Sequence, residues 1–114
     1  MDPTERVIAT LHPSIQDQVI DFVNAVRQAS EIPLIVTSGR RTLAQQRKLV
    51  AAGRSRTMQS KHLNGLAFDV DLLGIGRDDV SDDVWEWLGP SGENFGFVWG
   101  GRWVSFRDVG HFEV

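Results

Sequence analysis

The residues from Gly65 to Asp71 alternate between apolar and polar side chains, which is the pattern of a β-strand whose two faces meet different surroundings. One face consists of Leu66, Phe68 and Val70, and the other of Ala67, Asp69 and Asp71. The apolar face must be covered by other elements, whereas the opposite face presents carboxylates. This strand therefore predicts a layered fold in which one side of a sheet is core and the other is available for chemistry.

An amphipathic helix is predicted earlier in the chain, after Pro13. Ser14 and Asp17 resemble a capping pair at its start. Its apolar residues recur at helical spacing and are Ile15, Val19, Phe22, Val23 and Val26. His12 is interpreted as a residue of the approach to this helix. A short buried strand, rich in β-branched residues, is predicted from Leu34 to Thr37.

A second helix is predicted from Leu43 to Ala52. Thr42 and Gln45 fit a capping box at its start. Gly53 stands where a helix C-terminus favours a residue in the left-handed conformation.

A third helix is predicted to begin at Ser81 and to run through Leu88, where Gly89 and Pro90 should stop it. Two further strands are predicted at residues 97–99 and 111–114. Together these elements predict a compact α+β domain in which helices pack on a small, mainly antiparallel sheet.

The size and composition of the chain fit one soluble domain spanning residues 1–114. It has 114 residues, of which 41% are hydrophobic and 24% are charged. Residues 1–10 lack a basic region followed by an apolar run, and no apolar stretch is long enough for a bilayer, so we expect neither a secretory signal nor membrane insertion. Because the chain has no cysteine, any metal must be bound by His, Asp or Glu.

The charge of the chain is unevenly distributed, although the net charge is only -3. Between Ile32 and Phe68 there is no acid, and the cations are Arg40, Arg41, Arg47, Lys48, Arg54, Arg56 and Lys61. Such a segment could contact an anionic partner, either carboxylate-bearing cell-wall peptide or a phosphate backbone, or its cations could simply be solvated.

Three side chains are candidate ligands of one metal ion: His62, Asp69 and His111. Two imidazoles and a carboxylate suit a catalytic Zn²⁺ that keeps a fourth position for water. Asp69 lies on the polar strand face, and His62 lies in the turn-prone approach to that strand. His111 must come from an adjacent strand, and its spacing from Asp69 does not by itself establish a contact.

The pattern of these residues resembles that of the zinc-dependent peptidoglycan peptidases, a superfamily of D-alanyl-D-alanine carboxypeptidases and L-alanyl-D-glutamate endopeptidases that includes phage endolysins. The central pattern, Ser-x-His-x-x-Gly-x-Ala-x-Asp, is matched by Ser60, His62, Gly65, Ala67 and Asp69. Similar segments precede and follow it: Ser38-Gly39-Arg40-Arg41-Thr42, Trp99-Gly100-Gly101 with Trp103, and Asp108 with His111 and Phe112. The resemblance implies a hedgehog/DD-peptidase-like fold.

The resemblance also implies roles for individual residues. His62, Asp69 and His111 would bind zinc, and Asp108 would be the acid or base acting on the metal-bound water. Arg41 matches the arginine that neutralises the oxyanion, and Ser60 would bind substrate or orient a ligand. Arg40 departs from the family, whose members typically carry an aromatic residue there, so Arg40 is also a substrate-binding candidate.

The activity implied by the resemblance is zinc-dependent hydrolysis of the peptidoglycan stem peptide. Asp rather than Glu at position 108 favours cleavage of the L-alanyl-D-glutamate bond over removal of a terminal D-alanine. Bound zinc lowers the pKa of water to about 7, and Asp108 would pass the proton to the departing amine. The expected protein is a monomeric phage or prophage endolysin, made in the host cytoplasm without a signal peptide and acting at the cell wall or periplasm.

Two alternatives to this activity are a D-alanyl-D-alanine carboxypeptidase of the same fold and a non-enzymatic domain that binds wall polymer or nucleic acid through the cationic segment. Peptidoglycan is the expected partner, and nucleic acid is not. Three further interpretations are open. Asp71 either supports the metal ligands or is a solvated strand-end acid, Glu113 either supports His111 or is exposed, and one or two of the four tryptophans line a groove.

Overall fold

A computed structural model describes residues 2–55 and 57–114, so Arg56 of the cationic segment lies outside the described residues. Four antiparallel strands form one sheet in the order β1-β2-β4-β3. The strands are β1 (Leu34–Ser38), β2 (Ala67–Leu72), β3 (Val98–Trp99) and β4 (His111–Glu113). The helices are α1 (Thr4–Ile8), α2 (Pro13–Ala29), α3 (Leu43–Ala51) and α4 (Asp82–Asn94), with 3₁₀ turns η1 (Lys61–Asn64), η2 (Arg77–Asp79) and η3 (Gly100–Arg102). The predicted α+β architecture is confirmed.

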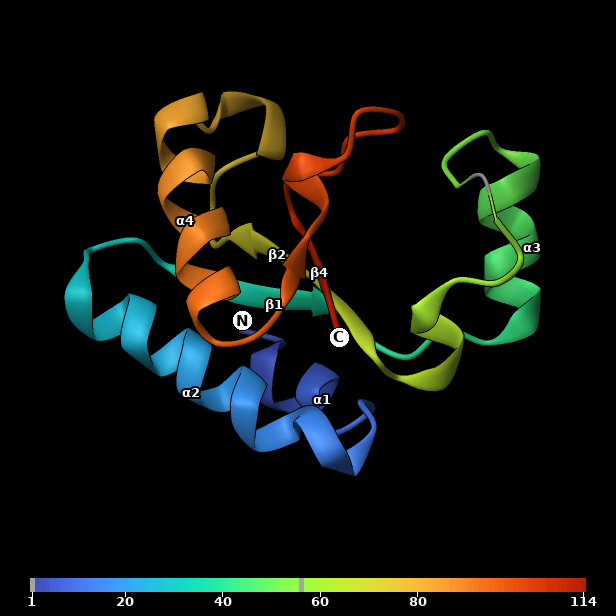
Figure 1. Ribbon diagram of the computed structural model, residues 1–114, viewed down its shortest axis with the longest axis horizontal. Helices are drawn as coiled ribbons and strands as arrows, with labels where there is room; N and C mark the ends of the chain where they lie inside the picture. Colours follow the sequence, from blue (N-terminus) through green and yellow to red (C-terminus); the bar gives the residue numbers. More distant parts are fainter. Residues whose placement is uncertain (1, 56) are drawn as a thin grey trace.

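The core lies where α2 and α4 cover the sheet (Figure 1). Phe22 of α2 packs against Phe112 of β4 with ring centroids 5.2 Å apart, and Phe112 stacks on Phe68 of β2 at 5.6 Å. All three rings are fully buried, as the helical spacing in α2 and the alternation in β2 predict. The other face of β2 is also shielded, because Ala67 and Asp69 are buried too.

The N-cap of α2 is His12, so the predicted capping pair of Ser14 and Asp17 is wrong. The Nδ1 atom of His12 accepts a hydrogen bond from the backbone N–H of Ser14 at 3.1 Å. Pro13 occupies the first helical position, where its missing N–H costs nothing, so the cap lies two residues earlier than predicted, at His12 instead of Ser14. Helix α1 was not predicted, since five residues are too few for a periodic pattern.

Helix α4 continues to Asn94, so the predicted stop at Gly89 and Pro90 is wrong. Gly89 lies against Trp99, where an added Cβ would come within 2.1 Å of a ring carbon. Gly92 lies against Phe112 in the same way, at 2.3 Å. The two glycines let the helix lie directly on two buried rings, and this packing outweighs the backbone hydrogen bond that Pro90 cannot make.

Helix α3 begins with the predicted capping box: Thr42 accepts from the N–H of Gln45, and the Gln45 side chain accepts from the N–H of Thr42. Gly53, just beyond the helix, has a φ of +72° as expected. Figure 1 shows α3 to one side of the sheet, apart from the other helices. Its one buried residue is Gln46, whose side chain makes hydrogen bonds with Arg41, Ser55 and Thr57 in the segments on either side of the helix.

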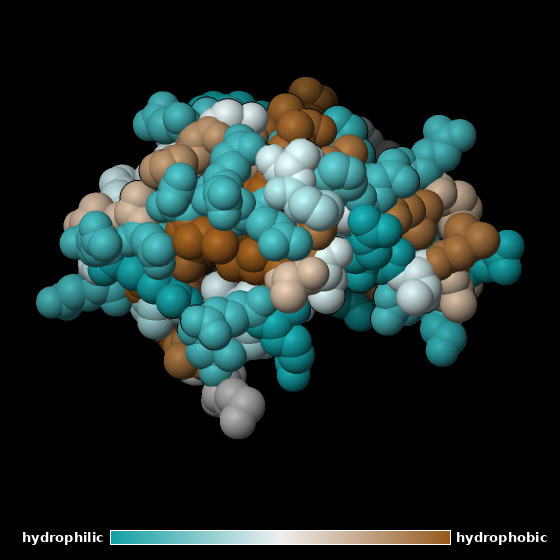
Figure 2. Space-filling model, turned by 90° about the horizontal axis from the view of Figure 1, so that it is seen from below, coloured by the Kyte–Doolittle hydropathy of each residue, from teal (hydrophilic) through white to brown (hydrophobic). Residues whose placement is uncertain are grey.

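The surface seen from the side of α1 and α2 is covered mostly by hydrophilic side chains, with small hydrophobic patches between them (Figure 2). Within the described residues, no helix combines the length and the apolar character that crossing a bilayer requires.

Candidate metal centre

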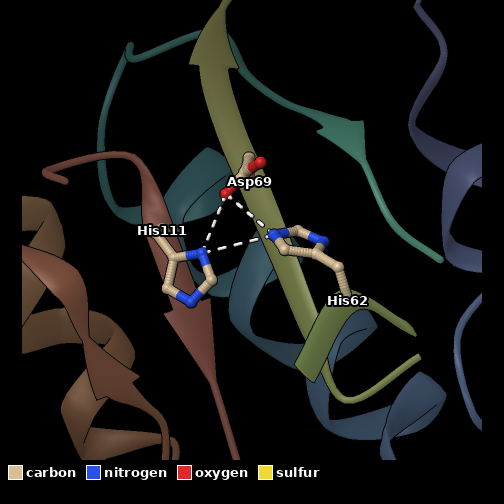
Figure 3. Close-up of side chains that lie close together, drawn as sticks. All are labelled: His62, Asp69 and His111. Carbon is tan, nitrogen blue, oxygen red and sulfur yellow. Dashed lines mark hydrogen bonds and ion pairs between the residues drawn. The ribbon is translucent and has the colours of Figure 1, made fainter. Parts of the chain in front are cut away.

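Three different elements bring His62, Asp69 and His111 together (Figure 3). Asp69 and His111 are direct partners across the antiparallel pair of β2 and β4. His62 belongs to η1, which Ser60 caps by accepting from the N–H of His62 at 3.2 Å. Gly65, at a φ of +70°, ends that turn and leads the chain into β2. The predicted convergence of the three side chains is therefore found in the structure.

The spacing of the three ligand atoms suits a tetrahedral metal ion. Asp69 Oδ1 lies 3.4 Å from His62 Nε2 and 3.1 Å from His111 Nδ1. The two nitrogens lie 3.3 Å apart. Bonds of about 2.0–2.1 Å to a tetrahedral zinc would separate neighbouring ligand atoms by about 3.3 Å. All three residues are buried, with at most 8% of their surface exposed, so little water competes for their lone pairs.

The outer nitrogen of each imidazole has an acceptor of its own. His62 Nδ1 lies 2.7 Å from the carbonyl oxygen of Gly39, and His111 Nε2 lies 2.9 Å from Glu113 Oε1. Since these oxygens accept, the outer nitrogens carry the hydrogens, and the inner nitrogens direct lone pairs at Asp69. Three electron-pair donors facing one another repel unless a cation or a proton lies between them. The donor set thus fits a divalent ion, with the supporting hydrogen bonds typical of metal-ligating histidines.

The protonation equilibria of the cluster reflect this crowding. Burial opposes ionisation of Asp69. When protons rather than a metal ion occupy the inner nitrogens of His111 and His62, the hydrogen bonds that these imidazoles donate, and their charges, hold the pKa of Asp69 far below the ordinary range. Burial likewise opposes charge on His111, yet its contacts with Asp69 and Glu113 raise its pKa. The support of His111 by Glu113, one of the two interpretations of that residue, is what the structure shows.

Arg41 points at the metal cluster, whereas Arg40 points away from it. Arg41 Nη2 donates to Asp69 Oδ2 at 3.0 Å, and Arg41 Nη1 donates to Gln46 Oε1 at 3.2 Å. Arg40 instead donates to the backbone carbonyls of Thr10 and Asn64. The two carboxylate oxygens of Asp69 therefore have different partners: Oδ1 faces the histidines and Oδ2 faces Arg41.

Asp108 lies on the segment that leads into β4, and a residue missed in the sequence, Arg77, contacts it. Arg77 Nη1 lies 3.4 Å from Asp108 Oδ1, while Arg77 Nε donates to Asp71 Oδ1 at 2.9 Å. The guanidinium fills the space beside Gly110, where an added Cβ would come within 2.5 Å of it. Asp71 thus pairs with Arg77 and Thr37. No spacing rule connects η2 to this site, so Arg77 could not be predicted from the sequence.

Cavities flank the metal cluster on two sides. One, of about 310 Å³, is lined by residues that include Ser60, His62, Trp103 and His111. The other, of about 790 Å³, is lined by residues that include Thr37, Asp69 and Arg77. Arg41, Arg54 and Asp108 line both, so an extended chain could pass the cluster from one cavity to the other.

The tryptophans divide between core and cavity. Trp103 lies with its ring centroid 5.0 Å from that of His111 and lines the smaller cavity. Trp85 and Trp99 are buried in the core, whereas Trp87 is exposed. One of the four lines the groove, within the predicted range.

Asp69 and His111 of the antiparallel sheet and His62 of η1 lie beside two cavities, which together form the groove at the metal cluster. This arrangement suits a hydrolase that uses a metal ion. Residues 53–114 match the sequence profile of the M15 peptidase family described as D-alanyl-D-alanine carboxypeptidase. The chain belongs to this peptidase family, as its resemblance in sequence implies.

Individual relatives are consistent with this assignment. The peptidoglycan L-alanyl-D-glutamate endopeptidase CwlK of Bacillus subtilis (strain 168) is 28% identical over 128 residues, covering 95% of this chain and 75% of CwlK. The L-Ala D-Glu endopeptidase ChiX of Serratia marcescens is 29% identical with a TM-score of 0.73, covering 97% of this chain and 85% of ChiX. The D,D-pentapeptidase VanY, solved with Zn(II), has a TM-score of 0.68 at 22% identity, covering 90% of this chain and 71% of VanY, and shares the fold.

Proposed function

We propose that this protein is a zinc-dependent peptidase that cleaves the L-alanyl-D-glutamate bond of peptidoglycan stem peptides. The observation that carries the proposal is the convergence of three lone-pair donors, His62 Nε2, Asp69 Oδ1 and His111 Nδ1, between two cavities. The specificity is supported by CwlK and ChiX, both named as endopeptidases for this bond. It is also supported by Asp at position 108, which resembles the endopeptidases.

His62, Asp69 and His111 would hold the zinc ion, which when bound supplies Lewis acidity and a nucleophile at neutral pH. Gly39 and Glu113 orient the two imidazoles, so the ligands are arranged before metal arrives. Asp108, which lines both cavities, would accept the proton of the attacking water and deliver it to the departing amine. Arg77 holds one oxygen of Asp108 and leaves the other for this task.

Arg41 would stabilise the negative charge that develops on the scissile carbonyl oxygen. Its guanidinium is fixed by Asp69 and Gln46 and borders both cavities. A charged donor fixed beforehand stabilises a transition state without reorganising during the reaction. Ser60 would act by holding η1, because its hydroxyl caps the turn that carries His62. Arg40 remains a candidate for substrate binding outside the metal cluster.

The test is digestion of purified muropeptides followed by mass analysis. The proposal predicts fragments that begin with D-glutamate, loss of cleavage with a chelator, and recovery when zinc is returned. Release of a single D-alanine would instead identify a D-alanyl-D-alanine carboxypeptidase, the activity by which the matching family is described.

The non-enzymatic alternative predicts a different result. Binding of wall polymer or nucleic acid through cations would survive chelation and fall steeply as salt rises, with no new fragments. The origin of the protein as a phage or prophage endolysin and its monomeric state stay predictions from the sequence.

A further inference from the structure

A third cavity, of about 530 Å³, lies between α1, the end of β1 and α3. It adjoins the groove at the metal cluster, because Thr37, Ser38, Arg41 and Leu49 line both this cavity and the larger of the two flanking ones. A molecule bound in the groove can therefore reach into this cavity without leaving the protein surface.

The cavity is lined by four cations and by no acid among the residues that the structure describes there. The cations are Arg6, Arg40, Arg41 and Lys48. Arg41 alone has a carboxylate partner, Asp69. For Arg6, Arg40 and Lys48, the described part of the chain provides no ion pair. All three side chains are exposed to solvent, which screens their mutual repulsion. Three like charges around one hollow still give it a positive potential that favours a bound anion.

The wall of this cavity is held in place by hydrogen bonds. Arg40 donates from its side chain to the carbonyl oxygens of Thr10 and Asn64, which are neutral acceptors that fix the guanidinium without cancelling its charge. The backbone N–H of Arg40 donates to Thr10 Oγ1. Gly39 allows this close approach, since a Cβ there would come within 2.4 Å of Thr10 Oγ1. These hydrogen bonds join the loop before α3 to the residues that follow α1, and they hold the charged side chain of Arg40 at the cavity wall.

We propose that this cavity binds a carboxylate of the substrate peptide, with Arg6 and Lys48 as determinants of specificity. The proposal rests on the proposed function. A glutamate residue in a peptide uses one of its carboxyl groups for the chain and keeps the other free. In the bond that CwlK and ChiX are named for, that residue lies on the amine side of the cut. A free carboxylate so near the scissile bond lies within reach of a cavity that shares Arg41 with the groove.

The test compares two synthetic stem peptides, one with the free D-glutamate carboxylate and one with that group amidated. Binding is measured by calorimetry on zinc-loaded protein in which Asp108→Asn prevents cleavage of the peptide. Cleavage is measured on protein that retains Asp108. The substitutions below are made in both. Arg6→Gln and Lys48→Gln are each expected to weaken binding of the free acid about two- to fivefold and to raise KM by a similar factor, with kcat retained. The amidated peptide should bind more weakly to begin with and should lose nothing further.

Arg47→Gln is the matched control, because Arg47 is an exposed cation of α3, next to Lys48, that does not line the cavity. The proposal is overturned if Arg6→Gln and Lys48→Gln resemble Arg47→Gln, or if both peptides lose affinity equally. The proposal is also overturned if Arg6→Gln and Lys48→Gln bind whole cell walls less well but bind the free-acid peptide as before. These cations would then contact another polyanion of the wall. If the unaltered protein binds the free acid selectively but cleaves neither peptide, the proposed function fails while this cavity assignment stands.

Discussion

At the scale of the residue, the metal centre depends on where the outer nitrogens of the two histidines donate. Glu113 accepts from His111 Nε2 and so fixes which nitrogen faces Asp69. We expect Glu113→Ala to weaken zinc binding by about 10- to 100-fold, because the imidazole loses both its orientation and its preferred tautomer. Glu113→Gln retains an acceptor oxygen and should lose much less. Competition with a fluorescent chelator measures both, and equal losses would show that charge rather than orientation matters.

Asp108 and Arg77 give a second residue-scale prediction. Asp108→Asn should retain zinc and fold normally while lowering kcat about 100-fold or more, since a proton acceptor is lost and no ligand is. Arg77→Ala should also lower kcat with zinc retained, because Asp108 loses the contact that holds one of its oxygens. Added guanidinium should partly restore Arg77→Ala but not Asp108→Asn. Metal analysis and steady-state kinetics test this, and loss of zinc from either variant would contradict it.

At the scale of the element, patterns within a few residues were sufficient to predict most helices and strands. The capping box of α3 and the strand β2 are both local features, and both are found in the structure, although β2 is buried on both faces and its burial does not alternate. The stop at Pro90 was wrong because contacts with Trp99 and Phe112, distant in sequence, keep α4 helical. The pairing of Asp69 with His111 depends on the register of β2 and β4, which a spacing of 42 residues cannot reveal. Arg77 was missed for the same reason.

The packing of α4 can be tested at Gly92. An added methyl group there would come within 2.3 Å of Phe112 Cε1. We expect Gly92→Ala to lower the free energy of unfolding by about 1–3 kcal/mol, despite the higher helix propensity of alanine. Asn94→Ala, at an exposed position of the same helix, is the control and should change little. Denaturant unfolding measures the difference, and a stabilised Gly92→Ala would show that the ring moves aside freely.

Helix α3 depends on Gln46, which joins it to the metal site. Its amide nitrogen donates to Thr57 O and Ser55 Oγ, and its oxygen accepts from Arg41. Gln46→Leu should cost about 1–3 kcal/mol of stability, because buried polar groups lose their partners, and it should lower kcat through Arg41. Unfolding and activity are measured together. Full activity in this variant would mean that Arg41 does not need Gln46.

At the scale of the whole molecule, proton and metal compete for the same cluster. The raised pKa of His111 means that its contribution to stability is complete below its unfolded pKa of about 6.5 and is lost as the pH rises through the folded value. The metal-free protein, prepared with a chelator, should therefore melt at a lower temperature at pH 8 than at pH 6. The zinc-loaded protein should not, because the metal replaces the proton. In the metal-free protein, His111→Gln should reduce the dependence of melting temperature on pH. An unchanged dependence would contradict this account.

The central claim is that His62, Asp69 and His111 bind one divalent ion together. Calorimetric titration of zinc into the chelated protein tests it most directly, in parallel with His62→Ala, Asp69→Ala, His111→Ala and the control His12→Ala, a histidine that caps α2. We predict one tight site per chain in the unaltered protein and in His12→Ala, and loss of that site in each of the other three. Tight binding that survives any of the three substitutions, or no tight binding in the unaltered protein, would contradict the account.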